Sequence, residues 1–592
     1  MGLTKAHNRM LEGVVPVTSV KEYGAVGDGV VNDQPAIAAA FAASKNIYFP
    51  PGTYRMEGSV SKSGTDNLTV DFGEAILLDA RTSTGSLFYF GTSSDTPLNT
   101  NLDVRGGTFN QSDPATTVNH GAIRVRGYTR FLIENLKVNN IGGGAIIVEA
   151  GCSNGIIRNV VMLGRTAYTP ARGIWLAGDT ASDYDASTNA YQDISTVQRT
   201  ATAFPVYRVD NVTVSDCTIE VDYYGIYLHN AHNCNFINNK IDISGVGAKR
   251  CLALNVYSTN TLVSGNTFTS DRSSTGILVT TYSTDTLIKN NLFNGDFGGN
   301  RDIYVRSGAR ATVDNNVFNT LTTQAIAVTM DGHAVIKNNT FNKSAYLVGE
   351  RCVHATPLDP SEVNPAMGAT CTTLIGSVIF TDNIINTRMI GINYDALTYP
   401  GGAASGSLPA MKTLVCKNNI FPDMTGAGAN EYPVFLTTEA SSTYQVSASY
   451  FGNEIFPASM VYKNTLYDGA GDGYTPLIDE DKDATFLVTS AASAGALTVD
   501  KITGSNMTLT IARSTTDFVL TPRTTGGGVP AIFGIVDESN TAAGVTVIAR
   551  FQIQKTPLNK YTVECFNAAG TQLDASTVAL KFKLKLGGTP IA

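Results

Sequence analysis

The chain has 592 residues, of which 16% are charged and 56 are glycine; this length exceeds one ordinary globular core, so we expect several domains or a repetitive architecture. A formal net charge of −8 without a basic tail or stripe argues against nucleic acid as a partner. The sequence contains no apolar run of about 18 residues, so we expect no insertion into a membrane.

Residues 1–16 are expected to form a short neck or attachment segment. Their start, MGLTKAHNRMLEG, has no apolar h-region, so we expect no secretion signal.

One helix is predicted near the start, in the stretch NDQPAIAAAFAA. An Asn or Asp precedes it as N-cap, Pro35 falls in its first turn, and Ile37 and Phe41 lie four residues apart on one face. Hardly another helical pattern follows. We therefore expect the helix to cover the open apolar end of a repetitive β-structure, which begins with IYFPPGTY (47–54).

A short motif recurs along the chain: apolar, polar, Asn or Asp, Asn, any residue, apolar. Clear copies are FINNKI, IKNNLF, VDNNVF and IKNNTF, and copies that end between residues 219 and 341 are 22 to 27 residues apart. This period, with alternating apolar residues and Asn-rich turns, is typical of one coil of a parallel β-helix. We expect the Asn side chains to stack and hydrogen-bond from coil to coil. The LxxLxL frame of leucine-rich repeats is missing.

A second strand follows most copies, as in GIWLA (173–177), GIYLH (225–229) and DIYVR (302–306). Its second and fourth residues are nearly all Ile, Leu or Val, so they are expected to point into the coil and the third and fifth to point outward. Aromatic faces beside polar groups are suited to sugar rings. The outward positions give five candidate substrate-binding residues: Trp175, Tyr227, His229, Tyr304 and Arg306.

Three alternatives to that interpretation stay open. The first is that a loop or a neighbouring subunit simply covers Trp175 and Tyr227. The second is that Arg306 pairs with a nearby acid, and the third is that His229 is a hydrogen-bonded member of a ladder. Oversized gaps in the repeat predict loops at residues 178–207, 345–374 and 395–409. The first of these loops leaves the chain directly after the strand that carries Trp175.

The regular pattern fades toward the C-terminus. Residues 461–484 are rich in Gly and Asp and are predicted as a linker. Short alternating strands then predict a β-sandwich over residues 485–592. Carbohydrate binding and trimer clamping are both open as its role.

The opening VKEYGAVGDGVVNDQPAIAAAFAAS…IYFPPGTY resembles that of pectate-lyase-superfamily β-helix proteins. With LTKAHNRMLEG before it, it resembles bacteriophage tailspike depolymerases. The resemblance implies a right-handed parallel β-helix over residues 17–460, assembled as a homotrimer. It also implies a virion tail protein made in the host cytoplasm, whose partners are a bacterial surface polysaccharide and a phage tail or adaptor protein. The fold says little about the reaction, because lyases, hydrolases and epimerases share it.

Hydrolysis of a glycosidic bond needs two carboxyl groups, ~5 to 5.5 Å apart for retention or ~6.5 to 9.5 Å apart for inversion. Stacked coils are ~4.8 Å apart, so an offset of one or two coils suits these geometries. The predicted catalytic acids near Trp175 are Glu149, Asp179, Glu220 and Asp222. For each of them, a solvated or ladder-bonded acid is the alternative.

The preferred function is endo-glycosidic depolymerisation of a capsule or O-antigen. The alternatives are a polysaccharide lyase that acts by β-elimination and a non-cleaving adhesin. The clustered acids that hold calcium in pectate lyases are not evident, and the motifs of polygalacturonases are missing. Eight cysteines without CxxC spacing are expected to be mostly reduced and buried. We therefore expect no metal and no cofactor.

Overall fold

A computed structural model describes residues 17–468 and 484–586, apart from loops. The larger stretches that it leaves out are residues 92–98, 112–119, 165–171, 179–183, 186–189, 192–207, 244–248, 343–350, 357–375, 396–412, 422–433, 438–447, 453–465, 491–496, 514–517, 525–531, 538–544, 549–560, 568–571 and 574–579, with shorter ones between other strands. Side chains are described as far as Phe421. None of the helices in this part of the chain has the length and apolarity that crossing a bilayer requires.

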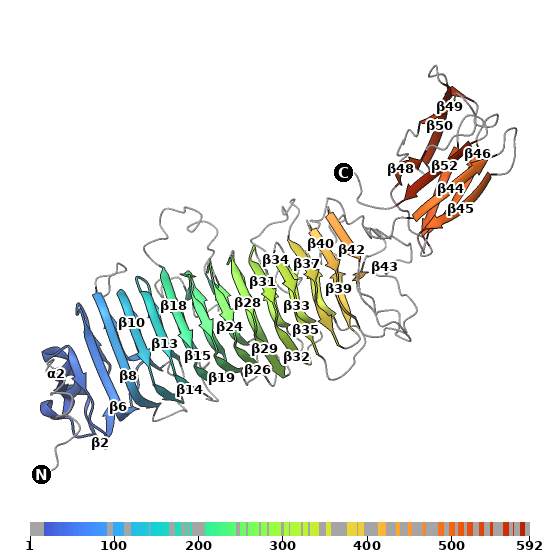
Figure 1. The fold of residues 1–592 in the computed structure, drawn as a ribbon. Coiled ribbons are helices and arrows are strands. Elements are labelled where there is room, and N and C mark those ends of the chain that lie inside the picture. Colours follow the sequence, from blue (N-terminus) through green and yellow to red (C-terminus); the bar gives the residue numbers. More distant parts are fainter. Residues whose placement is uncertain are drawn as a thin grey trace, which may run out of the picture.

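The predicted helix exists as α2 (Gln34–Ala43), after a 3-10 turn, η1 (Val20–Tyr23). Asp33 is its N-cap residue, and the Asp33 carboxylate accepts hydrogen bonds from the backbone N–H groups of Val26 and Gly27. Ile37 and Phe41 are buried, and the Phe41 ring lies 5.8 Å from that of Phe88. The helix therefore covers the first end of the β-structure, as expected (Figure 1).

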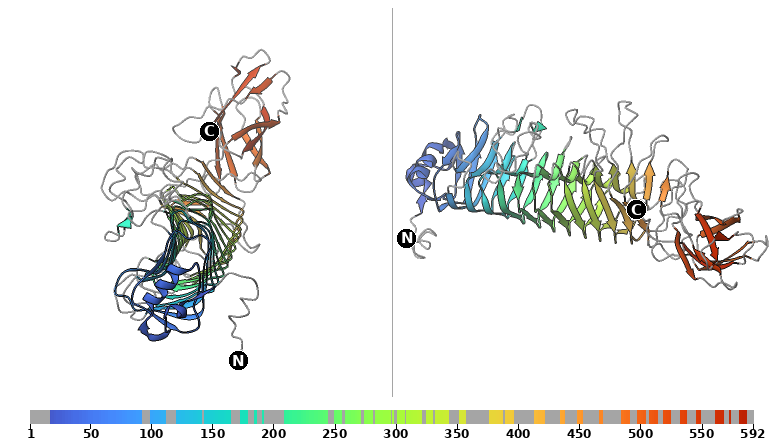
Figure 2. Two further views of the ribbon diagram at one scale, coloured as in Figure 1. Left: turned by 90° about the vertical axis from the view of Figure 1, so that its left-hand side faces the viewer. Right: turned by 90° about the horizontal axis from the view of Figure 1, so that it is seen from above.

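Two long parallel sheets make up the body of the protein, which Figure 2 shows along and across its axis. Sheet A is 27-stranded and sheet B is 14-stranded. The strands of sheet B are β5 (Val60–Lys62), β7 (Gly85–Gly91), β9 (His120–Arg126), β12 (Gly144–Glu149), β15 (Arg172–Ala177), β20 (Tyr224–His229), β24 (Lys249–Asn255), β27 (Ser274–Val279), β30 (Arg301–Val305), β33 (Gln324–Thr329), β36 (Arg351–Thr356), β39 (Ile390–Asp395), β41 (Val434–Thr437) and β43 (Leu466–Asp468).

Sheet A contains the strands of the Asn motif. They are β1 (Thr18–Ser19), β2 (Asp28–Asn32), β3 (Asn46–Tyr48), β4 (Thr53–Met56), β6 (Leu68–Asp79), β8 (Asn99–Gln111), β10 (Tyr128–Glu134), β11 (Lys137–Asn139), β13 (Ser153–Arg158), β14 (Val161–Gly164), β18 (Val209–Ser215), β19 (Thr218–Val221), β21 (Ala231–His232), β22 (Asn235–Ile237), β23 (Lys240–Ile243), β25 (Leu262–Ser264), β26 (Thr267–Ser270), β28 (Thr286–Lys289), β29 (Leu292–Gly295), β31 (Arg310–Asp314), β32 (Val317–Thr320), β34 (His333–Lys337), β35 (Thr340–Phe341), β37 (Ser377–Thr381), β38 (Ile384–Ile385), β40 (Thr413–Lys417) and β42 (Ala448–Gly452).

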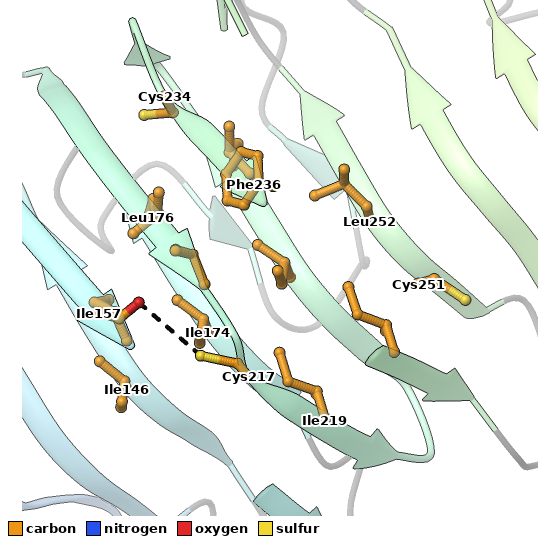
Figure 3. Close-up of a cluster of buried hydrophobic side chains, with 14 of the residues drawn as sticks. Ile146, Ile157, Ile174, Leu176, Cys217, Ile219, Cys234, Phe236, Cys251 and Leu252 are labelled. Carbon is orange, nitrogen blue, oxygen red and sulfur yellow. Dashed lines mark hydrogen bonds between the residues drawn. The ribbon is translucent and has the colours of Figure 1, made fainter. Parts of the chain in front are cut away.

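Each turn of the chain adds strands in register with those of the coil before. In sheet B, for example, Ile226 pairs with Ile174 on one side and with Leu252 on the other. These inward residues belong to one continuous buried core, part of which is drawn in Figure 3. Cys217 and Cys234 lie in this core, and burial raises the pKa of both thiols to about 12. The predicted β-helix is confirmed.

The two Asn residues of the motif have different structural roles. The first, as in Asn290 and Asn315, adopts a left-handed conformation with φ of 56° and 53°, which Asn tolerates better than most residues. The second is buried, and its amide side chain bonds to the same residue of the next coil. This ladder, which we call the Asn ladder, consists of Asn239, Asn266, Asn291, Asn316, Asn339, Asn383 and Asn419. The expected stacking of Asn is confirmed.

The apolar residue that ends the motif forms a second stack inside the core. The Phe293 ring lies 5.1 Å from that of Phe268 and 4.8 Å from that of Phe318, nearly parallel to both. Phe341 continues the stack, 4.8 Å from Phe318. Core packing therefore repeats with the same register as the hydrogen bonds.

One predicted loop is wrong in part. The segment 345–374 contains β36, which pairs with β33 and β39 as one more strand of sheet B. The sequence RCVHAT hides this strand because its inward residues are Cys352 (strand position two), Val353 and Ala355 rather than large aliphatic residues.

The boundaries of the C-terminal parts stay predictions. The last strand of the stack, β43, lies within the segment predicted as a linker. Beyond residue 484, described strands form antiparallel sheets. The first has β44 (Ala484–Ser490), β45 (Leu497–Thr503), β48 (Ile532–Asp537) and β52 (Leu580–Leu586); the second has β46 (Met507–Arg513), β47 (Phe518–Thr524), β49 (Val545–Ile548), β50 (Tyr561–Asn567) and β51 (Gln572–Leu573).

Candidate functional site

The outer face of sheet B carries a small apolar cluster of its own, separate from the core. Each residue of this cluster pairs with the next from coil to coil and is the third residue of a five-residue segment such as GIWLA; in order they are Trp175, Tyr227, Ala253, Leu278, Tyr304 and Ala327. The prediction that these residues point outward is confirmed. Tyr227 and Tyr304 are nevertheless 7% and 2% exposed, because neighbouring side chains cover much of their rings.

The aromatic rings at the first end of this cluster contact one another. Trp175 and Tyr227 meet edge to face with ring centroids 5.7 Å apart, and Tyr224 lies 5.2 Å from Tyr227. Trp175 is half-buried. The indole is therefore a partly exposed aromatic surface that packs against Tyr227, which in turn packs against Tyr224.

Arginines surround these rings. The Arg172 guanidinium lies 5.2 Å from the centroid of Trp175 and 5.4 Å from that of Tyr223. Arg250 donates a hydrogen bond of 3.1 Å from Nη1 to the Tyr224 hydroxyl. Tyr304 lies between Arg301 at 4.2 Å and Arg306 at 5.2 Å. The outer face thus combines apolar ring surface with cationic hydrogen-bond donors.

Glu149 is a buried acid near this cluster. It ends β12, one coil before Ala177, and its side chain is 5% exposed. Arg124 donates a hydrogen bond to Glu149 Oε1 and lies 5.5 Å from the ring of Tyr89. Glu149 Oε2 has no hydrogen-bond partner among the described residues. Glu149 is therefore both an ion-paired side chain and a carboxylate with unused accepting capacity.

Glu220 and Asp222 lie at the other end of the sheet B strands. Glu220 belongs to β19 of sheet A, in register with Asp242 of the next coil, and Asp222 precedes β20. Glu149 aligns through Ala177 with His229, the last residue of β20. The six residues of β20, ~20 Å of strand, therefore separate Asp222 from the column of Glu149.

The four predicted acids thus fall into two groups rather than one. Glu149 pairs with Ala177 of the next coil, and Asp179 follows two residues after Ala177 in the sequence. Asp179 itself lies outside the described residues. Glu220 and Asp222 form the second group. Within one chain, a separation near 20 Å is too large for the two groups to form a carboxyl pair by either stereochemical route.

His229 is buried in the outer layer of sheet B between Ala177 and Asn255. Burial lowers its pKa to about 4, so His229 is neutral near pH 7. The neighbouring Asn255 donates a hydrogen bond of 2.9 Å from Nδ2 to the Tyr227 hydroxyl. His229 therefore contributes polarity without a positive charge.

Replacing His229 with Asn, the residue of the next coil, should remove part of the acid sensitivity of the fold. The His229 imidazole binds a proton near pH 6.5 in the unfolded chain but only near pH 4 in the folded chain. The contribution of neutral His229 to the free energy of unfolding is therefore complete above pH 6.5 and is lost as the pH falls toward 4. The loss is about 3 kcal/mol for this shift. Denaturant unfolding from pH 7.5 to 4.5 measures it; equal pH slopes for the wild type and His229→Asn would contradict this.

Sequence reasoning missed two parts of this face. Arg172 and Arg301 stand directly before the segments GIWLA and DIYVR, from which outward positions were predicted, and Arg351 starts a strand that was predicted as a loop. These three arginines were therefore missed. The contact between Arg124 and Glu149 joins two coils whose motifs are weak. In the described residues, no cluster of His, Cys, Asp or Glu has the geometry of a metal site.

Comparison with known proteins extends this picture. The family model "Rhamnogalacturonase A/epimerase, pectate lyase-like" matches residues 17–249, and "Right handed beta helix region" matches residues 203–364. The chain contains a right-handed β-helix, and its residues 17–249 are similar to pectate lyase-like proteins. The predicted resemblance and the handedness of this β-helix are thereby confirmed.

Individual relatives of the β-helix are distant. Plasmin and fibronectin-binding protein A of Streptococcus pneumoniae is 26% identical over 172 residues, which cover 25% of this chain and only 24% of that protein. The crystal structure of PfbA, a surface adhesin of Streptococcus pneumoniae, has a TM-score of 0.48 at 18% identity, covering 64% of this chain and 93% of the other.

Two further solved structures are similar to the β-helix. A tailspike mutant of E. coli bacteriophage HK620 in complex with a pentasaccharide has a TM-score of 0.43 at 11% identity, covering 98% and 95% of the two chains. The catalytic unit of a GH87 α-1,3-glucanase from Streptomyces thermodiastaticus has a TM-score of 0.37 at 13% identity, covering 76% and 71%.

Proposed function

We propose that the chain is a phage tailspike that binds and depolymerises a bacterial surface polysaccharide, a capsule or an O-antigen. The outer face of sheet B, with Trp175 and Tyr227 beside arginines, is the observation that carries this proposal. The resemblance of the first residues to tailspike depolymerases and the match to a pectate lyase-like family model support it. The working form is a homotrimer on the virion tail, attached to the tail or to an adaptor protein.

The face has the chemistry that a sugar chain needs. The apolar C–H face of a sugar ring packs against a partly exposed indole, and its hydroxyl rim needs donors and acceptors close by. Arg172 and the Tyr227–Asn255 pair supply such groups next to Trp175. Because the tyrosines and arginines hold one another, little side-chain entropy is lost when a glycan binds.

The proposed reaction is endo-glycosidic hydrolysis by two carboxyl groups. One carboxylic acid protonates the leaving oxygen, and the other carboxylate activates water or attacks the anomeric carbon. The candidate pairs are Glu149 with Asp179 and Glu220 with Asp222. Glu220 is the third residue of β19, and Asp222 follows directly after the end of this strand, so the second pair lies at one corner of a single coil.

Elimination from a uronic acid polymer is the second candidate. It needs a base and a cation that neutralises the sugar carboxylate. Arg172, Arg250 and Arg306 offer the cation. His229 and Tyr227 are the candidate bases; burial raises the pKa of Tyr224, so the Tyr224 hydroxyl stays protonated near pH 7 and does not supply the base.

Incubation with purified capsules and O-antigens tests the proposal. New reducing ends without the ultraviolet absorbance of an unsaturated uronate support hydrolysis, and that absorbance identifies elimination. Binding without a loss of polymer size identifies an adhesin. No binding to any glycan would overturn the proposal.

Single variants then separate the two carboxyl pairs. Replacing either member of the working pair by its amide, as in Glu220→Gln and Asp222→Asn, should lower turnover by at least about 100-fold. Glu149→Gln and Asp179→Asn should leave turnover within a few fold if the second pair works. Asp314→Asn, on the outer face of sheet A, is the matched control. Full turnover in all four variants would contradict the proposed site.

A further inference from the structure

In every second strand of sheet B over seven successive coils, an arginine occupies the same register position, at or next to the first residue of the strand. Arg172 pairs with Tyr224, which pairs with Arg250, and Arg250 pairs with Thr275. Ile277 pairs with Ile303, which places Thr275 beside Arg301, and Gln324 then separates Arg301 from Arg351. We call Arg172, Arg250, Arg301 and Arg351 the arginine row. Neighbouring members are two coils apart, ~9.6 Å along the axis.

The side chains of the row lie on the outer face, with the aromatic cluster. Arg172 contacts the face of Trp175 and Arg301 that of Tyr304, while Arg250 bonds to the Tyr224 hydroxyl. All four arginines are half-buried. The guanidinium groups of Arg172, Arg250 and Arg301 are therefore held in place at the surface where the proposed glycan would lie.

The charge of these strands is opposite to that of the whole chain. From β9 to β36, the strands of sheet B contain seven basic residues but only two acidic ones, Glu149 and Asp302. Glu149 accepts from Arg124, and Asp302 is buried and accepts a hydrogen bond of 2.7 Å from the Thr320 hydroxyl. The chain as a whole has a net charge of −8. A basic strip on an acidic protein attracts anions to one face.

We propose that the arginine row recognises a polyanionic polysaccharide, one with a carboxylate or phosphate group in its repeat, that lies along the axis of the β-helix. This inference rests on the proposed function and names its substrate class. The planar guanidinium binds carboxylate or phosphate oxygens with two parallel hydrogen bonds. Regularly spaced acidic groups on one chain engage several members of the row at once, so their contributions multiply.

The test uses a panel of purified bacterial capsules and O-antigens, acidic and neutral. Each carboxylate-bearing polymer is included a second time with its carboxyl groups reduced to alcohols, and each phosphate-bearing polymer after removal of its phosphate. Binding is measured for the wild type, Arg250→Gln and Arg250→Lys, at low and high NaCl concentration. Lys240→Gln, on the exposed side of sheet A, removes the same charge elsewhere.

The wild type should bind acidic members of the panel and lose at least tenfold in affinity when their acidic groups are removed. Arg250→Gln should weaken binding by about tenfold, Arg250→Lys by less, and Lys240→Gln not at all. Thermal unfolding of each variant shows that the fold is kept. Equal binding of acidic polymers and their neutral forms, or of neutral members alone, would overturn the arginine row but leave the proposed function standing. Binding to no member would overturn both.

Discussion

Replacing Asn316 with alanine lowers the free energy of unfolding by about 3 kcal/mol or more. Asn316 Oδ1 accepts from the backbone N–H and the side-chain amide of Asn291, and Asn316 Nδ2 donates to Ile288 and Asn339. Alanine leaves at least two buried groups of neighbouring coils without a partner, at ~1 to 3 kcal/mol each. Denaturant unfolding, followed by circular dichroism, measures the change.

Asn319→Ala is the control in the same coil. Asn319 also bonds to Asn of both neighbouring coils, at 3.2 Å to Asn294 and 2.9 Å from Asn342. It is exposed, so water replaces those bonds and the expected loss is within about 0.5 kcal/mol. Similar losses in both variants would show that burial of the Asn ladder is not what stabilises the stack.

Replacing Trp175 with alanine weakens glycan binding by about 10- to 30-fold. The substitution removes the partly exposed indole and its contacts with Arg172 and Tyr227, and truncation of such a central aromatic residue typically costs about 2 kcal/mol of binding free energy. The measurement is titration of the wild type and the variant with a polysaccharide that the wild type binds.

Tyr23→Ala is the matched control, because Tyr23 is 40% exposed at the capped end of the β-helix, outside sheet B. It should leave binding unchanged. Trp175→Phe, which keeps an aromatic face, should recover part of the loss. Unchanged binding in Trp175→Ala, with the fold intact, would show that the glycan lies elsewhere.

Much of the fold was predictable because the register of a β-helix repeats. A period of two places Ile226 inward and Tyr227 outward, and the period of the coils then puts Tyr227 beside Trp175. The helix at residues 34–43 followed from local signals, its N-cap and Pro35. The strand β36 was missed because its small inward residues do not stand out from a loop.

The site was less predictable, because its groups meet across the strands rather than along them. Glu149 lies one coil before Trp175 and Asp222 one coil after it. They nevertheless lie at opposite ends of the strands of sheet B, which only the pairing register reveals. Arg124 contacts Glu149 from a coil without a clear motif. The arginine row is visible only when residues of seven coils are aligned by their hydrogen-bonded partners.

A crystal structure of the protein with a bound oligosaccharide of the polymer that it binds tests the central claim most directly. We expect sugar rings on the outer face of sheet B, packed against Trp175, with acidic groups of the sugar at Arg172 or Arg250. An oligosaccharide bound only on sheet A, or only on the sheets beyond residue 484, would contradict the account.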